Sequence, residues 1–405
     1  MTPPSATRGT LWVILASATL TVMAGGLLGP IVPAIQSGLG VSESLAGLII
    51  TTHGLLIVLA SPVVGSLIDR FGPRRPYIFG LLLYGVGGGA GLVVDSFVPL
   101  LLSRAVLGVG VAFIYTGTLV LIYRLYSGPQ MNRALGLQSS ANSLGAVAWP
   151  LVGGALGTLS WQAPFGVYLV ALPLGLLAVV AIPEIARGGH GSESGDESGS
   201  GAGTSAGGGS ALAVFRRRPA LLSVYLLHFG ANALLYSIIV FYPPLLAGVG
   251  VSSSFGISLY LAANGLAGGI SAALYDRLLE RTTKHVLVLT ALGLWLLAFV
   301  SAVLANSALT AVPAAIAFGL GLGLAFPSAF GWIEGLAPAG QTGQFTSYLA
   351  SAGYTGQFLS PILFGPLIPL AGVRGVFAAA AVTTAIALLA LGGTLGWRRR
   401  GRSIV

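Results

Sequence analysis

The sequence predicts an all-α membrane protein in which twelve transmembrane helices form two related six-helix bundles. Hydrophobic residues make up 55% of the 405 residues and charged residues only 7%, with a mean hydropathy of +0.91. A soluble domain has about a quarter of its residues charged. Long apolar stretches alternate with short polar segments, and several sequence patterns of the first half return in the second. Together these observations indicate a repeated, helical membrane protein.

Each span is predicted from the length of its apolar stretch, because about 20 helical residues cross roughly 30 Å of hydrocarbon. The stretches are continuous, whereas the strands of a membrane barrel alternate apolar and polar residues. We expect spans at about 11–36, 45–68, 76–94, 97–126, 134–159, 163–183, 219–246, 254–275, 285–305, 308–333, 344–369 and 375–396.

A segment rich in Gly, Ser and acidic residues, 187–213, interrupts this series after the sixth span. Such a composition buries too little apolar surface to fold, so we expect a flexible cytoplasmic linker. It separates an N-terminal six-helix bundle, residues 1–186, from a C-terminal one, residues 214–405.

Lys and Arg residues predict the orientation. All 19 except Arg104 and Arg374 fall on one side of the membrane if both termini are placed there. Cytoplasmic loops are enriched in these residues. We therefore expect a multi-pass protein of the cell (inner or plasma) membrane with both termini cytoplasmic. This placement also argues against nucleic-acid binding, despite a net charge of +9. The absence of cysteine excludes disulfides and thiolate chemistry.

The two halves align by eye. Residues 107–113 of the fourth span match 320–326 of the tenth, 145–154 match 356–365, and 38–42 match 248–252. Two repeats of six spans are related by a twofold axis along the membrane normal, and transporters built this way bind substrate near the midplane between the halves.

Three motifs carry the strongest signals. The loop after the second span, 65–75, contains Gly65, Asp69, Arg70, Gly72, Arg74 and Arg75, and a weaker copy at 272–281 contains Asp276 and Arg277. In the fourth span Arg104 precedes two glycines. The fifth span contains Gly145, Pro150, Gly153 and Gly154. The eleventh repeats the device with Gly353, Gln357, Pro361 and Gly365, which are four residues apart and so share one helix face.

These motifs resemble signatures of the major facilitator superfamily over essentially the whole chain. Residues 65–75 resemble Gly-x-x-x-Asp-Arg-x-Gly-x-Arg-Arg, and 145–154 resemble the Gly-x-x-x-Gly-Pro-x-x-Gly-Gly signature of drug:proton antiporter-type efflux proteins, with Trp149 in place of the central Gly. The resemblance implies a twelve-helix secondary transporter working by alternating access, driven by a proton gradient and needing no cofactor.

The loop motif predicts a conformational latch. Asp69 could accept hydrogen bonds from backbone N–H groups at the start of the eleventh span and pair with a base such as Arg124, which would favour the outward-open state. Arg74 and Arg75 would face anionic lipid headgroups. The alternative is that these charges fix the topology only. The proline and glycine residues of the fifth and eleventh spans predict either close packing or a seam that bends.

Arg104 is the main candidate for proton coupling or for binding substrate charge, because a charge inside the membrane costs roughly 2.5–3.5 kcal/mol on insertion scales. The alternative is a side chain that snorkels outward. All ten Asp and Glu residues fall in loops or at span ends. The remaining titratable candidates are His53, His228 and Glu334.

The substrate cavity is expected between spans one, four, seven and ten. Its mid-depth residues would be Met23, Phe113, Tyr115, Asn232, Tyr236, Phe326 and Phe330. Aromatic faces, a thioether and one amide suit a lipophilic or amphipathic ligand, neutral or anionic. Each aromatic residue could instead serve packing alone.

The sequence therefore predicts a non-enzymatic, monomeric transporter whose partners are a small-molecule substrate and membrane lipid, and whose activity is proton-coupled efflux. A metabolite importer or facilitative uniporter of the same superfamily is the alternative. An intramembrane enzyme would need converging polar residues that the spans lack, and a receptor would need a soluble signalling domain.

Overall fold

The computed structural model describes residues 8–184, 211–338 and 341–402, and within these ranges the fold is entirely helical. Most of the predicted linker, 187–210, lies outside the described residues. Its last three positions, 211–213, belong to a short helix that the composition did not predict.

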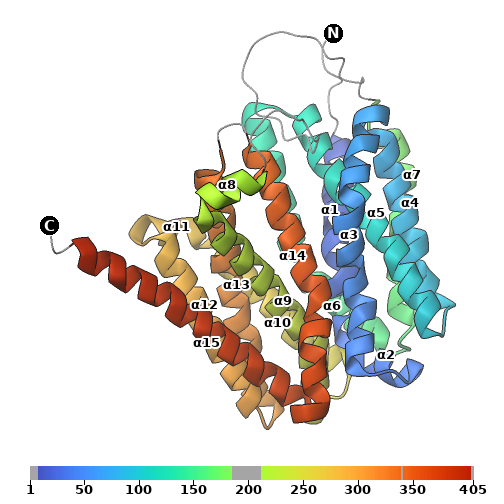
Figure 1. The fold of residues 1–405 in the computed structure, drawn as a ribbon. Coiled ribbons are helices and arrows are strands. Elements are labelled where there is room, and N and C mark those ends of the chain that lie inside the picture. Colours follow the sequence, from blue (N-terminus) through green and yellow to red (C-terminus); the bar gives the residue numbers. More distant parts are fainter. Residues whose placement is uncertain (1–7, 185–210, 339–340, 403–405) are drawn as a thin grey trace.

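The first half of the chain forms the blue-to-green helices of Figure 1. Their bounds are α1 Arg8–Gly26, a 3-10 turn Gly29–Ile31, α2 Val32–Leu39, α3 Glu43–Phe71, α4 Arg74–Gly89 with a 3-10 turn Ala90–Leu92, α5 Phe97–Leu125, α6 Gly128–Gly157, a 3-10 segment Ala163–Val170 (η3) and α7 Ala171–Ala181.

The second half repeats this order with two short additions, α8 and α11. The bounds are α8 Ala211–Arg217, α9 Pro219–Gly248, α10 Ser254–Ala273, α11 Tyr275–Arg281, α12 Lys284–Leu304, α13 Ala308–Leu336, α14 Thr342–Phe364, a 3-10 turn Gly365–Leu367 and α15 Ile368–Arg402. The last helix is interrupted at Gly372, whose φ of 64° is left-handed.

Twelve helical segments cross the bundle in the described part of the chain, as predicted. Nine stretches pass a test of length and hydropathy for a membrane span, and the last of them, Thr342–Gly393, contains both α14 and α15. Two crossing helices fail that test: α4 has only 16 residues, and α6 carries polar residues in its first half. Packing against neighbouring helices, rather than hydropathy alone, therefore places them.

Turn glycines and caps define one end of the bundle. Gly40 and Gly250 adopt φ angles of 62° and 96°, which L-residues with side chains rarely adopt. Ser42 and Ser253 follow them and cap α3 and α10 by accepting hydrogen bonds from backbone N–H groups. We call this the Gly40 end. The opposite end, where α3 turns into α4 at Gly72, is the Gly72 end.

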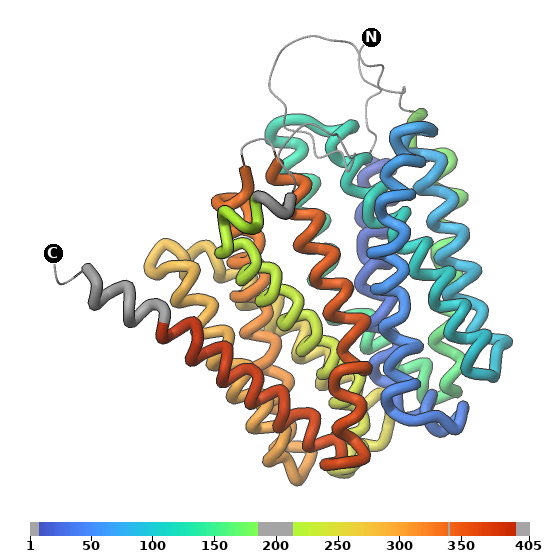
Figure 2. The backbone as a smooth tube through the Cα atoms, in the orientation of Figure 1, coloured from blue at the N-terminus to red at the C-terminus, as the bar shows by residue number. Residues whose placement is uncertain are grey.

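Two large apolar clusters divide the core. One contains residues of α1–α7 together with Tyr236 of α9, and the other contains residues of α9–α15. Figure 2 shows the same division as two groups of tubes that lean together at the Gly40 end, at the bottom of the view. The fold is thus two bundles of six crossing segments each.

Glycine contacts correct the register of the sequence repeat. Gly108 packs on His53 and Gly319 on Asn264, while Gly110 packs on Tyr84 and Gly321 on Trp295. The alignment by eye pairs Gly108 with Gly321. These two glycines pack on helices that are not equivalent in the two halves, α3 for Gly108 and α12 for Gly321. That alignment was wrong, because the Gly-x-Gly pattern occurs in two overlapping registers in α13, at 319–321 and 321–323, and only packing distinguishes them.

Helices α6 and α10, and α3 and α14, join the two halves. At each junction a glycine brings one helix against the backbone of the other: Gly265 against Ala146, and Gly54 against Tyr354. The close contacts lie toward the Gly40 end. Toward the Gly72 end, Gly136 and Ser139 of α6 are exposed. The halves therefore pack at the Gly40 end and separate toward the Gly72 end.

Candidate functional site

Arg104 of α5 is the one charged side chain that is completely buried among the described residues. Its Nε donates to the carbonyl oxygen of Ile49 in α3 at 3.1 Å, and its Nη2 donates to that of Ala24 in α1. Its guanidinium carbon lies 4.8 Å from the ring centroid of Tyr168. Backbone carbonyls and an aromatic face thus hold the charge inside the protein, and it does not extend to the interface.

The end of α1 explains why these carbonyls are available. The helix ends at Gly26, and its last carbonyl groups lack the usual partner four residues on. Tyr168 of η3 donates to the carbonyl oxygens of Met23 and Ala24 at 3.3 and 3.2 Å. Tyr84 of α4 donates to that of Leu20 at 2.6 Å. Arg104 and Tyr168 therefore bond the last turn of α1 at Ala24, and Tyr84 bonds the turn before it. The role of Met23 here is through its backbone, and its side chain is buried in the core.

His53 of α3 lies next to this group. Its Nδ1 is 2.6 Å from the carbonyl oxygen of Ile50, and its ring centroid is 6.2 Å from that of Tyr236 in α9. Tyr236 belongs to the other half but lies in the first apolar cluster, with its hydroxyl against Gly25. Arg104 bonds the carbonyl oxygen of Ile49, one helical turn before His53, and Gly108, one turn after Arg104, packs on the backbone of His53. A titratable imidazole therefore lies beside a permanent charge at a contact between the halves.

A second polar group lies in the C-terminal half. Asn232 Nδ2 donates to the carbonyl oxygen of His228 at 2.9 Å, and Gln357 Nε2 of α14 donates to Asn232 Oδ1 at 2.9 Å. Gly353 provides the space, because a Cβ there would lie 2.9 Å from both Asn232 Nδ2 and His228 Nε2. The sequence predicted His228 and Asn232, but placed Gln357 only in a packing stripe. The four-residue spacing of Gln357 and Pro361 indicates a shared helix face, but it cannot indicate a hydrogen bond from Gln357 to α9.

Aromatic rings surround this second group. The His228 ring lies 5.1 Å from Phe326 and 5.6 Å from Phe330, both on α13, measured between centroids. Tyr115 of α5 packs edge-on against Tyr354 of α14 at 6.1 Å, across the boundary between the halves. Of the predicted cavity residues, Phe326 and Phe330 are thus near one polar group and Tyr236 is near the other, while Tyr115 packs on Tyr354 at the boundary between the halves.

Phe113 lies elsewhere. Its ring packs at 5.5 Å against Phe79, and its Cβ lies against Gly80, both on α4. It is buried within the N-terminal half and faces away from the C-terminal half in this conformation. The sequence indicates that Phe113 lies partway along this helix, but it does not indicate the direction of its side chain.

The predicted hinge residues lie in the contacts between helices. Gly153 packs against the backbone of Leu27, next to the break after α1, and Gly154 packs against Ser254 and Ser258 of α10. In the other half, Pro361 lies against Gly47, and Gly365 against Ser44. Pro150 and Gly145 are buried within α6. Trp149, the departure from the family signature, donates from its indole N–H to the carbonyl oxygen of Thr19 at 3.0 Å.

The loop motif at 65–75 makes contacts within its own half. Gly65 is buried, and Gly72 turns the chain with a φ of 77°. Arg75 Nη2 bonds Glu184 Oε1 at 3.1 Å, while Arg74 donates to the carbonyl oxygen of Val179 in α7. The expectation that both arginines face lipid headgroups is therefore incomplete, because each also bonds the end of the sixth span. The folding of the bundle brings residues 74–75 close to residues 179–184, and the sequence alone does not show this proximity.

The remaining charged candidates are exposed at the Gly72 end. Asp69 and Arg70 are exposed; the Arg70 guanidinium lies over Phe71, and Asp69 makes no hydrogen bond or ion pair within the described ranges. Asp276, Arg277 and Glu334 are exposed as well. The expected bond from Asp69 to the start of α14 is therefore not formed in this conformation, in which the halves are apart at that end.

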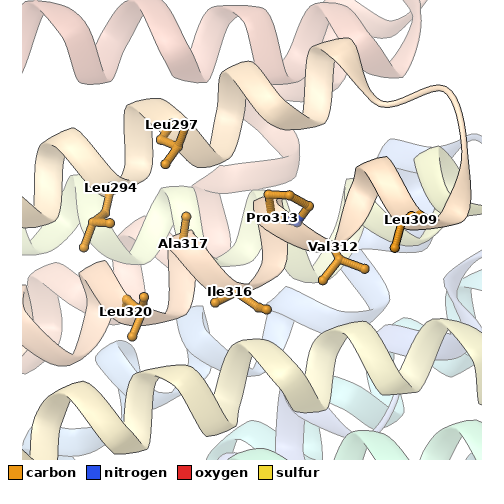
Figure 3. A pocket seen from close by; sticks show the side chains of 8 residues that line it. All are labelled: Leu294, Leu297, Leu309, Val312, Pro313, Ile316, Ala317 and Leu320. Carbon is orange, nitrogen blue, oxygen red and sulfur yellow. The ribbon is translucent and has the colours of Figure 1, made fainter.

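One apolar groove lies far from both polar groups. Leu294 and Leu297 of α12 and Leu309, Val312, Pro313, Ile316, Ala317 and Leu320 of α13 line it. Figure 3 shows these side chains along the two helices, with no polar side chain among them. Such a surface suits contact with lipid acyl chains and offers nothing to orient a substrate.

Comparison with known proteins identifies the family. A sequence profile of the Major Facilitator Superfamily matches residues 14–361. The chain belongs to this superfamily. It is 29% identical over 174 residues to multidrug resistance protein 1 of Bacillus subtilis (strain 168), covering 42% of this chain and 43% of that protein. It is 34% identical over 176 residues to the class C tetracycline resistance protein of Escherichia coli, covering 41% and 43%. The matches thus span less than half of these relatives.

Solved structures of the superfamily share the fold. The nucleoside transporter NupG superposes with a TM-score of 0.77 at 15% identity, covering 95% of this chain and 100% of that one. At this identity the likeness extends to the architecture alone. This member of the Major Facilitator Superfamily is therefore a multi-pass membrane protein.

Proposed function

We propose that this transporter exports a lipophilic or amphipathic molecule in exchange for protons. The observation that supports it most is the position of His53. The imidazole lies beside Arg104, the one buried charge of the described residues, and contacts Tyr236 of the opposite half. Proton binding there would place a second positive charge next to Arg104, and this repulsion would weaken a contact that holds the halves together.

The orientation follows from the basic residues. Arg70, Arg74, Arg75, Arg124, Arg133, Arg216 to Arg218, Arg277, Arg281 and Lys284 all lie at the Gly72 end. Because cytoplasmic loops are rich in Lys and Arg, we place the Gly72 end in the cytoplasm and the protein in the cell membrane, with both termini inside. The conformation described above is then open to the cytoplasm.

Alternating access would follow from rocking of the two units, 1–186 and 214–405, in a monomer. In this conformation the seams at Gly154 and at Gly54 close the external side. In the outward-open state the seams would part, and Asp69 would meet the start of α14 to close the cytoplasmic side. Rigid-body rocking of repeats about a central site is the expected mechanism for transporters of this build.

Two relatives are named as a multidrug resistance protein and a tetracycline resistance protein, and these names support export of such compounds by this chain. Exposed Glu334 has no buried position from which it could carry a proton through the interior, so His53 is the better candidate. His228 is buried in the other half, among Phe326, Phe330 and the backbone at Gly353.

The test is transport of a dye panel by the full chain in proteoliposomes, with and without an imposed pH gradient. Accumulation of a dye against its own gradient, only when the pH gradient is present, is the expected result. Movement of a dye only down its concentration gradient would make the protein a facilitator and overturn the proton coupling.

A further inference from the structure

The hydrogen bonds between His228, Asn232 and Gln357 have a defined direction. Asn232 Nδ2 donates to the backbone carbonyl oxygen of His228. Turning this amide round would place Oδ1 against another acceptor, and two acceptors cannot bond. Oδ1 therefore faces Gln357, whose Nε2 must be the donor in the next bond. The backbone of α9 thus orients both side-chain amides.

One acceptor is left over at the end of this chain of bonds. Gln357 Oε1 is buried and has no hydrogen-bond partner. A buried carbonyl oxygen without a donor costs about 1–3 kcal/mol relative to a satisfied one. An amide oxygen can only accept, so any group that relieves this cost must bring an N–H or an O–H.

A second buried atom without a partner belongs to the same cluster of side chains. His228 is 6% exposed, and its Nδ1 also lacks a partner. Its ring is held between Phe326 and Phe330 of α13 and the backbone of α14 at Gly353. Phe330 is 43% exposed, so the imidazole lies one aromatic ring away from accessible surface. Two unsatisfied polar atoms beside aromatic faces are the features of a site that orients an aromatic ligand.

The charges around the site determine the charge of that ligand. Across the described spans no Asp or Glu is buried, so a cation would have no counter-charge here. Arg104, the one buried cation of the described residues, lies in the other half, where it bonds the carbonyls of Ile49 and Ala24. The surroundings therefore favour a neutral molecule.

From these contacts we infer that His228, Gln357, Phe326 and Phe330 form a subsite for a neutral aromatic molecule that carries a hydrogen-bond donor, such as a phenol, an aryl amine or an aromatic amide. Gln357 is the residue that determines specificity, because its Oε1 accepts from the donor of the ligand. This subsite refines the proposed transport function, on which it rests, by naming the chemical class of its substrate.

The test compares two probes that differ in one donor, 1-naphthol and 1-methoxynaphthalene. Binding is measured by equilibrium dialysis against the full chain in lipid nanodiscs, with empty nanodiscs subtracted. One net hydrogen bond predicts that 1-naphthol binds about three- to tenfold more tightly. Gln357→Leu should abolish this preference by weakening 1-naphthol, and leave 1-methoxynaphthalene unchanged.

Gln344→Leu is the matched control, because Gln344 is an exposed glutamine on the same helix that bonds only Tyr348. It should keep the preference. Thermal unfolding shows whether Gln357→Leu is folded, and if it is not, the comparison of the two probes on the unmodified protein decides. Equal binding of both probes, no binding of either, or a preference that survives in folded Gln357→Leu would each overturn the subsite.

Dye efflux driven by a pH gradient is measured on the same preparation. If dye transport is present while the probe preference is absent, the proposed function stands and only the subsite is lost. If the preference is present without gradient-driven transport, the subsite stands and the proton coupling is lost.

Discussion

The rings of His53 and Tyr236 meet across the boundary between the two halves, 6.2 Å apart and inclined at 45°. Tyr236 extends from α9 into the apolar core of the N-terminal half, where its hydroxyl lies against Gly25. A change of charge on His53 would therefore act directly on a contact that must break when the external side opens. This relationship connects a titratable group to the motion expected of the superfamily.

Replacing His53 with Gln should separate transport from proton coupling. Glutamine keeps a polar side chain of similar size but cannot take up a proton. We expect counterflow exchange of labelled substrate to persist and accumulation driven by a pH gradient to be lost, both measured in proteoliposomes. The matched variant is His285→Gln, on a histidine that packs against Trp332 at the Gly72 end and belongs to neither polar group; it should keep the response to the gradient. An unchanged gradient response in His53→Gln would exclude this histidine as the proton carrier.

Replacing Arg104 with Ala should reduce both stability and transport. The substitution removes the donors of Arg104 from the carbonyl oxygens of Ile49 and Ala24, and only the hydroxyl of Tyr168 still donates to Ala24 from a side chain. Each lost bond to a charged donor costs about 1.5–3 kcal/mol, so a clear fall in Tm is expected. Arg104→Lys should recover only part of the loss. Its ammonium group keeps the charge but lacks the guanidinium fork that reaches two helices. Arg75→Ala, on an exposed arginine, is the control, and an equal Tm for both alanine variants would contradict the structural role of Arg104.

The sequence predicted the spans and the motifs because hydropathy and glycine patterns are local. It predicted that Arg104 either acts inside the membrane or snorkels outward, since a charge in the membrane needs a partner or water. It could not identify the partners, because they are backbone carbonyls at the end of α1 and the ring of Tyr168, and neither leaves a pattern at the position of Arg104.

Side-chain direction was the other property that the sequence could not provide. Phe113 and Tyr115 are two positions apart on α5, yet one packs on α4 and the other reaches α14. Membrane helices are apolar on all faces, so the hydrophobic period that locates the core of a soluble helix is absent. For the same reason Gln357 was placed correctly on the face of Pro361 without any indication of its bond to Asn232.

Asp69→Asn should favour the conformation described here. Asp69 makes no ion pair or hydrogen bond with the described residues in this state, so the variant loses nothing in it. In the proposed outward-open state it would lose charge-assisted bonds to the start of α14. We therefore expect labelling of Ser139→Cys from the Gly72 end to increase, and the chain has no native cysteine to interfere. Asp95→Asn, an exposed acid at the Gly40 end, should have no effect. Unchanged labelling in Asp69→Asn would remove the latch.

Gly154→Ala should have the opposite effect, because it acts on the seam at the Gly40 end. A Cβ at this position would lie 2.6 Å from the carbonyl oxygen of Ser254 and 2.6 Å from Ser258 Oγ, both on α10. Contacts this short force α6 and α10 apart, and the cost is expected only while the external side is closed. The population should shift toward the outward-open state, and a cysteine introduced at buried Val240 should react faster from the Gly40 end.

Gly136→Ala is the matched control for this last prediction. It lies on the same helix, and a Cβ there would meet no atom within 4 Å. Alanine in place of glycine stabilises a helix by about 0.5–1 kcal/mol, so the control should be slightly more stable and should label as the parent does. If Gly154→Ala and Gly136→Ala label alike, the glycine seam serves packing only, and the motion that exchanges the two states must pass through α3 and α14 instead.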